Sequence, residues 1–148
     1  MSLIGRGVKL FTCSKAKAAL INFGTRLEEC KKASDKLSTK GIDCTIIDAR
    51  FAKPLDEKLI MEAASNHEVL ITIEEGSIGG FGSHVMQFLS DRGVFDRGLK
   101  FRSMILPDLF IDQDTPEKMY QIAGLDSKAI EEKVHEVLDS KIVIQKKN

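Results

Sequence analysis

The residues best placed to do chemistry lie in one glycine-rich run, EEGSIGGFGSH at positions 74–84. The run follows the apolar segment VLITI at 69–73 and precedes a helical pattern, so it predicts a strand, a glycine loop and a helix start. At such a junction, backbone N–H groups and the helix dipole can bind an anion, and the loop can also contact a neighbouring domain. The candidate contact residues in this run are Glu75, Gly79, Gly80, Gly82, Ser83 and His84.

Three known motifs do not match the run. A dinucleotide fingerprint, G-x-G-x-x-G, would begin at Gly80 and needs a third glycine where Val85 stands. A Walker A loop needs Gly-Lys followed by Ser or Thr, and this tripeptide is absent from the chain. A nucleophile elbow needs a glycine two residues before and after its serine, which neither Ser77 nor Ser83 has. A tight turn whose glycines relieve crowding between helix and sheet is the simpler interpretation.

Two further side chains could take part in chemistry. Arg50 follows a predicted strand, at the sheet edge where α/β proteins place their sites, so it is either an anion contact or a salt-bridge partner. His84 falls in the first turn of a predicted helix and could transfer a proton, but no partner serine or cysteine is evident. A packed or surface imidazole is the alternative. His67 and His135 lack ligand-like spacing, so we predict no metal site.

Composition limits the classes of protein that the chain can belong to. The 148 residues include 22 basic and 22 acidic side chains, so no net charge attracts nucleic acid or anionic lipid. Three cysteines without a C-x-x-C pair or a secretory signal indicate reduced thiols in the cytoplasm. The apolar runs are far shorter than the roughly 20 residues of a membrane-spanning helix. We expect one domain over 5–139, an appended segment or linker at 1–4, and a flexible tail at 140–148.

Strand and helix patterns alternate along this domain, which predicts an α/β fold with right-handed crossovers. The expected strands are 18–23, 42–48, 68–73 and 101–106. The expected helices lie at about 25–40, 57–66, 84–92, 116–123 and 127–139, with caps at Thr25, Asp56, Thr115 and Asp126. Cys30 shares the apolar face of the first helix and is interpreted as a core residue.

Several motifs occur here in the order that one enzyme family has them. They are DARFAKPLD at 48–56, the glycine run at 74–84 and LPDLFID at 106–112, with NFGT at 22–25 and AGLD at 123–126. On these motifs the chain resembles the C-terminal domain of the 1-deoxy-D-xylulose-5-phosphate synthase family, over about residues 5–139. The resemblance implies a three-layer transketolase-type fold: a mostly parallel five-stranded sheet, one antiparallel edge strand from residues 7–13, and helices on both faces.

The resemblance also implies a function for the intact enzyme. Such enzymes join pyruvate to glyceraldehyde 3-phosphate with loss of carbon dioxide, using thiamine diphosphate and magnesium, at the entry to non-mevalonate isoprenoid synthesis. They are homodimers, and their cofactor lies between the two domains that precede this one. The Gly-Asp-Gly start of the cofactor motif is absent here, so we expect no catalytic, cofactor or metal residue in this chain and no activity of the chain alone.

Three hypotheses follow for the domain itself. In the first, Arg50 and the loop from Glu75 to His84 dock it against a preceding domain or across the dimer. In the second, the domain is a free-standing module that holds a phosphate or nucleotide in the Gly76–Ser83 loop. In the third, it is a small enzyme with Cys13 or Cys44 as nucleophile. The family resemblance favours the first.

Overall fold

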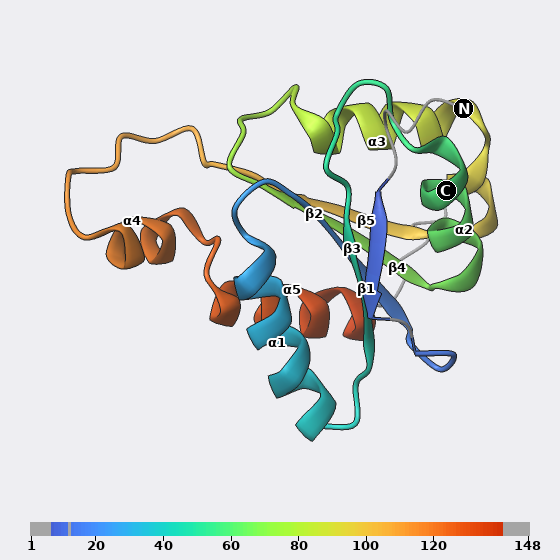
Figure 1. Cartoon of the computed structure of the whole chain (residues 1–148), viewed down its shortest axis with the longest axis horizontal. Helices are drawn as coiled ribbons and strands as arrows, with labels where there is room; N and C mark the ends of the chain where they lie inside the picture. Colours follow the sequence, from blue (N-terminus) through green and yellow to red (C-terminus); the bar gives the residue numbers. More distant parts are fainter. Residues whose placement is uncertain (1–6, 12, 141–148) are drawn as a thin grey trace, which may run out of the picture.

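A five-stranded sheet forms the centre of the computed structural model, which describes residues 7–11 and 13–140 (Figure 1). Its strand order is β1-β3-β2-β4-β5, with β1 antiparallel to β3 and the other neighbours parallel. The strands are β1 (Val8–Phe11), β2 (Ala18–Phe23), β3 (Cys44–Asp48), β4 (Val69–Glu74) and β5 (Lys100–Met104). The expected mostly parallel sheet with one antiparallel edge strand is confirmed. The segment at 1–4 and the tail from 141 onward lie outside the described residues.

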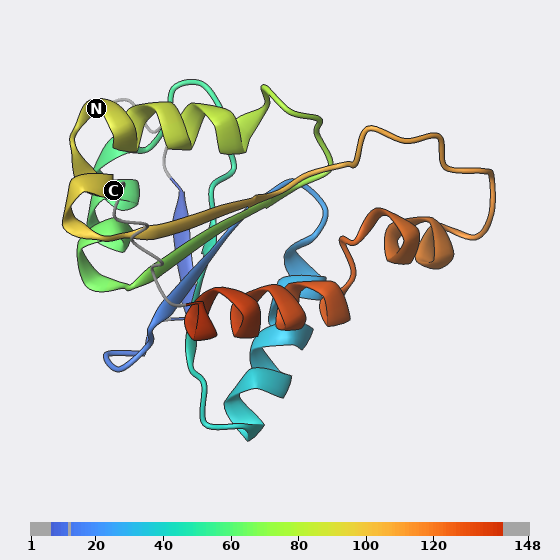
Figure 2. The same cartoon turned by 180° about the vertical axis from the view of Figure 1, so that it is seen from behind.

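Helices cover both faces of the sheet, because successive strand residues point to opposite sides. Leu20 packs with helices α1 and α5 on one face, and Ile21 packs with α2 and α3 on the other. Figures 1 and 2 show these two layers on either side of the strands. The four helices are α1 (Leu27–Thr39), α5 (Ser127–Asp139), α2 (Glu57–Asn66) and α3 (Phe81–Asp91). A short 3-10 helix, Val94–Arg97, which the sequence pattern did not predict, joins α3 to β5.

Three of the four predicted helix caps are present. Asp56 and Asp126 each accept a backbone N–H of the first turn, at 3.0 and 2.9 Å, and Thr115 does so at 3.5 Å. The prediction for Thr25 is wrong: α1 begins at Leu27, and the hydroxyl of Thr25 donates instead to a carboxylate on a distant loop. This tertiary contact holds the hydroxyl group that was predicted to cap the helix.

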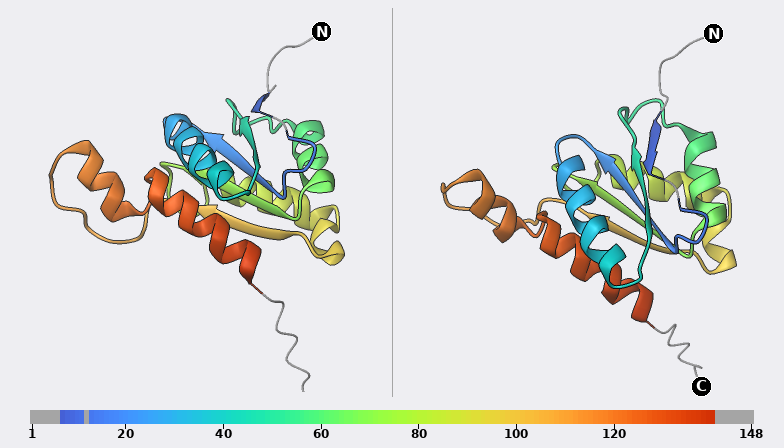
Figure 3. Two further views of the ribbon diagram at one scale, coloured as in Figure 1. Left: turned by 90° about the horizontal axis from the view of Figure 1, so that it is seen from below. Right: turned by 60° about the horizontal axis from the view of Figure 1, so that its bottom comes forward.

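Between β5 and α5 the chain leaves the layered body as an arm, defined here as residues 105–123. It comprises a loop and the short helix α4 (Pro116–Ala123), which Gly124 ends in a left-handed conformation, as predicted. Figures 2 and 3 show the arm projecting beyond the sheet and the four packed helices. The predicted strand at 101–106 stops at Met104, since the N–H of Leu106 donates across to the glycine loop, to Gly76 O at 2.9 Å.

Candidate functional site

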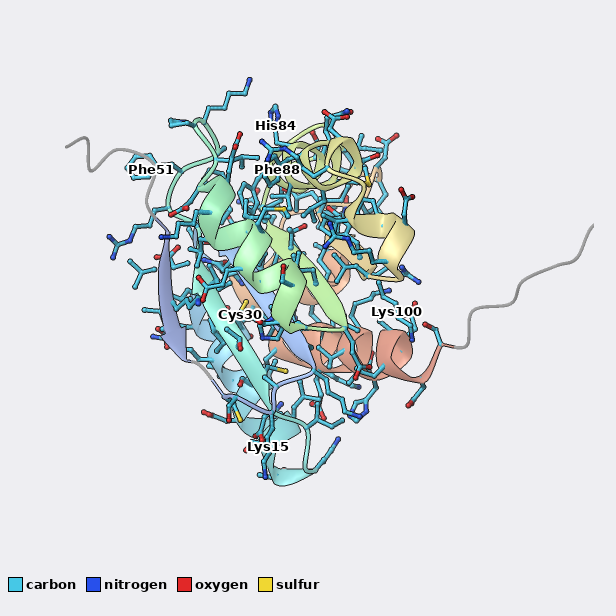
Figure 4. All side chains as sticks on the ribbon, turned by 90° about the vertical axis from the view of Figure 1, so that its right-hand side faces the viewer. Lys15, Cys30, Phe51, His84, Phe88 and Lys100 are labelled. Carbon is cyan, nitrogen blue, oxygen red and sulfur yellow. The ribbon has the colours of Figure 1, made fainter. Side chains whose placement is uncertain are left out.

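All the predicted contact residues lie at one edge of the sheet, where the parallel strands have their carboxyl ends. The loop after β3 carries Arg50, and the loop after β4 together with the start of α3 carries the rest. The start of α1 and the arm complete this edge, since they follow β2 and β5. Figure 4 shows Phe51 and His84 at the same end of the molecule and Lys15 at the other. The sheet therefore brings these separate segments together, as the predicted topology requires.

A buried carboxylate occupies the centre of the glycine loop. Glu74, the last residue of β4, is only 2% exposed. Its two oxygens accept the backbone N–H groups of Phe81, at 3.0 Å, and of Gly82, at 2.5 Å, in the first turn of α3. These are donors that a helix leaves unpaired at its start, and the helix dipole favours a negative charge there. The anion that this loop binds is a side chain of the protein itself.

The glycines are required by the crowding around that carboxylate. A Cβ atom on Gly76 or Gly80 would overlap Glu74 Oε1. On Gly82, a Cβ would overlap the Ser103 hydroxyl and lie 2.6 Å from Thr72 Oγ1. The simpler interpretation of the run, in which its glycines relieve crowding, is therefore correct for Gly80 and Gly82.

Gly79 is required for a different reason. Its φ is +94°, and an added Cβ would meet no atom within 4 Å, so backbone conformation rather than space demands glycine. Its N–H donates to Ser83 Oγ at 2.9 Å. The N–H groups of Gly79, Phe81 and Gly82 therefore all have acceptors already. A phosphate would have to compete with Glu74 for the N–H groups of Phe81 and Gly82, and the negative charge of Glu74 would repel it. The geometry thus disfavours a phosphate site in this loop.

Glu74 is not among the contact residues predicted from the sequence, yet its placement could have been found. In β4 the residues alternate between the two faces, and Glu74 shares the face of Leu70, which packs against α3. An acidic residue at the end of a buried strand, pointing toward a helix start, indicates a helix cap contributed from a distant part of the chain.

Glu75 joins three segments through its carboxylate. Arg26 Nε lies 3.1 Å from Glu75 Oε1, and the hydroxyl groups of Thr25 and Tyr120 also bond this carboxylate. The Arg26 guanidinium carbon lies 3.4 Å from the centre of the Tyr120 ring. Burial alone would raise the pKa of Glu75, but these bonds outweigh it and hold that pKa below 4.5, while the pKa of Tyr120 is raised above 10.0. Glu75 therefore ties the glycine loop to α1 and to the arm.

The side chain of Arg50 is about half exposed and makes one long ion pair. Its Nε lies 3.9 Å from Asp48 Oδ2, and 53% of its side chain is exposed, so this ion pair is weak. Its φ of 60° lies in the left-handed region, which few residues other than glycine adopt. The salt-bridge interpretation thus holds only in part, and about half of the side chain is exposed.

His84 lies in the first turn of α3, as predicted, and is half-buried (Figure 4). Within residues 7–11 and 13–140, no side-chain hydrogen bond or ion pair involves it. In that part of the chain, no acid, base or nucleophile is hydrogen-bonded to the imidazole of His84. The packed or surface imidazole is the interpretation that fits its surroundings.

The cysteines are not prepared for nucleophilic chemistry. Burial raises the pKa of Cys30 and of Cys44 to about 12, which keeps both thiols protonated at neutral pH. Cys13 is half-buried and lies 3.5 Å from a carboxylate oxygen of Asp43. In the described part of the chain, no side-chain hydrogen bond joins any of the three thiols to a histidine, lysine or arginine, so none resembles an activated nucleophile.

Comparison with known proteins gives the family. The fold is an α/β domain in which Glu74 fills the anion site of the glycine loop, and residues 7–130 match the model of the transketolase C-terminal domain. The chain belongs to this family. None of the helices among the described residues is long and apolar enough to cross a membrane.

Solved structures agree with this assignment. A structure described as a split gene transketolase, inactive beta4 tetramer, shares 27% identity over 90% of this chain with a TM-score of 0.77. A transketolase mutant from Pichia stipitis has a TM-score of 0.64 at 13% identity, and a second mutant, in complex with fructose 6-phosphate, has 0.62 at 14%; these two show the fold alone. The present chain spans 42% of the first of these proteins and 18% of the other two.

Proposed function

We propose that the chain is the C-terminal domain of a 1-deoxy-D-xylulose-5-phosphate synthase. The motifs at 48–56, 74–84 and 106–112 support this assignment within the broader transketolase family. The complete enzyme would be a thiamine-diphosphate-dependent, magnesium-dependent cytoplasmic homodimer that condenses pyruvate with glyceraldehyde 3-phosphate and releases carbon dioxide. In it this domain serves as support and interface and carries none of the reacting groups.

The described residues do not fit thiamine diphosphate and its metal ion. Among them no group of three or more His, Cys, Asp or Glu side chains could hold a cation. The N–H groups at the start of α3, which could receive a diphosphate, are bound to Glu74. We therefore assign the cofactor to the preceding domains and derive no catalytic step within this one.

The observation that best supports an interface role is that Arg50 is exposed at the carboxyl edge of the sheet. The anion site at this edge is filled internally by Glu74, while 53% of the Arg50 side chain is exposed and its ion pair with Asp48 spans 3.9 Å. An exposed arginine held in an unfavourable backbone conformation suits a contact with another protein surface, because arginine is enriched in interfaces.

Activity of the full-length enzyme tests the assignment of the reaction. The enzyme should form 1-deoxy-D-xylulose 5-phosphate from pyruvate and glyceraldehyde 3-phosphate and should depend on thiamine diphosphate. Transfer of a two-carbon ketol group between sugar phosphates, without use of pyruvate, would identify a transketolase instead and refute the finer assignment.

A substitution in the full-length enzyme tests the interface role of Arg50. Arg50→Ala should weaken dimer or domain association, measured by sedimentation and by the thermal midpoint of the holoenzyme. Arg97→Ala, which removes an exposed arginine far from the carboxyl edge, is the matched control and should have no effect. Equal behaviour of the two variants would remove Arg50 from the interface.

A further inference from the structure

Exposed apolar side chains gather at the carboxyl edge. Seven large hydrophobic residues are exposed among those that the structure describes, and five of them lie in the loops after β3 and β4 or in the arm that follows β5. The most exposed are Phe110, at 91%, and Ile78, at 84%. The five are Phe51, Ile78, Leu109, Phe110 and Ile122. Scattered exposed apolar residues are ordinary on protein surfaces, but a concentration at one edge indicates an interaction surface.

The arm is anchored in a way that leaves Phe110 outside. Leu106 and Ile111 pack against the core beneath α1 and α5, and the N–H of Leu106 binds Gly76 O at 2.9 Å. Between these two anchors, the N–H of Leu109 binds Pro107 O at 2.9 Å. Since Gly76 is two residues before Ile78, the same hydrogen bond brings the glycine loop beside the base of the arm. Leu106 and Ile111 therefore hold both ends of the segment that carries Phe110, while the Phe110 side chain itself is exposed.

The charge around Phe110 has one sign. The loop and the first turn of α4 carry four exposed carboxylates, and the only cation among residues 105–118 is Lys118, which pairs with Asp114 at 3.5 Å. The four are Asp108, Asp112, Asp114 and Glu117. An apolar centre within an acidic rim is complementary to an apolar pocket edged by lysine or arginine.

We propose that the arm is a docking element that inserts Phe110 into a basic-edged apolar pocket on the preceding part of the same enzyme. This rests on the proposed function, which places further domains before this one. The split-gene transketolase structure supports such an occupant. This chain covers only 42% of that chain, so more than half of that protein lies outside the matched domain. A symmetric contact between two arms would instead bring like charges together, which is destabilising.

The loop of the arm provides a direct measurement of docking. Within the described part of the chain, Leu109 and Thr115 supply the only backbone N–H groups of residues 107–115 that have a hydrogen-bond acceptor. Without a partner, the other amides of this loop should exchange with deuterium near their intrinsic rates. Slow exchange in the intact enzyme then reports coverage by another surface.

The test is hydrogen–deuterium exchange on the full-length enzyme and two variants. In the wild type, the amides at 108 and 110–114 should exchange at least about tenfold more slowly than their intrinsic rates. In Phe110→Ser, the same amides should exchange about 30-fold faster than in the wild type, or at the intrinsic rate where protection is smaller than that. Met86→Ser removes a side chain that is 46% exposed on α3, away from the arm, and should leave the arm protected.

Three results would overturn the docking proposal. The first is an unprotected arm in the wild type, and the second is protection that survives Phe110→Ser. The third is protection that appears only when the protein concentration is raised and the protein self-associates. The last would identify a second copy as the occupant. The enzyme assay is scored separately, so a protected arm in an enzyme with a different activity would refute the proposed reaction and leave the docking intact.

Discussion

Replacing Glu74 with alanine should destabilise the 148-residue chain by several kilocalories per mole. The substitution leaves the N–H groups of Phe81 and Gly82 buried without an acceptor, and it removes a negative charge from the start of α3. Each unsatisfied buried group costs about 1–3 kcal/mol, and the lost interaction with the helix dipole adds about 1 kcal/mol. The expected loss of unfolding free energy is therefore about 3–7 kcal/mol, which is a large part of the stability of a typical domain.

Glu74→Gln separates charge from shape. The glutamine side chain fills the same volume, but its amide nitrogen faces one of the two N–H donors, so one hydrogen bond becomes a repulsive contact. The loss should be about half that of the alanine variant, roughly 2–3 kcal/mol. The order of stability is wild type, then glutamine, then alanine.

Urea unfolding followed by circular dichroism measures these differences. With a slope of about 2 kcal/mol per molar urea, a loss of 4 kcal/mol lowers the midpoint by about 2 M. Glu117→Ala removes an exposed carboxylate from the first turn of α4 and should change the unfolding free energy by only about 0.5 kcal/mol. Formate, which has the size of the missing group, should stabilise Glu74→Ala more than the wild type.

One result refutes the reasoning: if Glu74→Ala and Glu117→Ala unfold at the same urea concentration with unchanged slope, the glycine loop does not depend on its internal anion. The disfavoured phosphate site would then need to be tested by calorimetry with inorganic phosphate and common nucleotides.

Three other predictions concern the same domain. Because the folded pKa of Glu75 lies below 4.5, its stabilisation is present above the unfolded pKa and is lost as pH falls through the folded one. The difference in unfolding free energy between wild type and Glu75→Gln should therefore be full at about pH 6–7 and vanish in acid, and a difference independent of pH would contradict the ion pair. A thiol reagent at neutral pH should label Cys13 in the folded protein, while Cys30 and Cys44, with pKa values of about 12, should react only after unfolding, as mass spectrometry would show. Gly82→Ala should lower the unfolding free energy by about 1–3 kcal/mol because the new methyl group meets side chains of β4 and β5; an unchanged midpoint would mean that the loop can move away.

Local patterns in the sequence were sufficient to predict most of the architecture. The apolar run at 18–23 predicts the strand that is observed, since a strand buried on both faces contains few polar residues. Asp56, Thr115 and Asp126 were recognisable as caps because capping depends on residues only three positions apart. The family motifs supplied the mostly parallel five-stranded sheet and its antiparallel edge strand, which periodicity cannot specify, and the strand order came from the fold.

The roles of the site residues depended on contacts between segments far apart in the chain. Thr25 has the chemistry of a cap, yet its hydroxyl is bound by Glu75, 50 residues away. The glycine run was compatible with either an anion site or a crowded turn, and only the fold shows that both descriptions hold, with Glu74 as the anion.

Sequence periodicity tells which face of a strand a side chain occupies, but not which helix start or loop meets that face. For this protein, the order of residues determined the elements and the family. Tertiary packing decided that Glu74 occupies the anion site of the glycine loop and that Arg50 and Phe110 are exposed at the surface. The physical reason is that a hydrogen bond or a buried contact joins atoms by distance in space, which sequence spacing alone does not define.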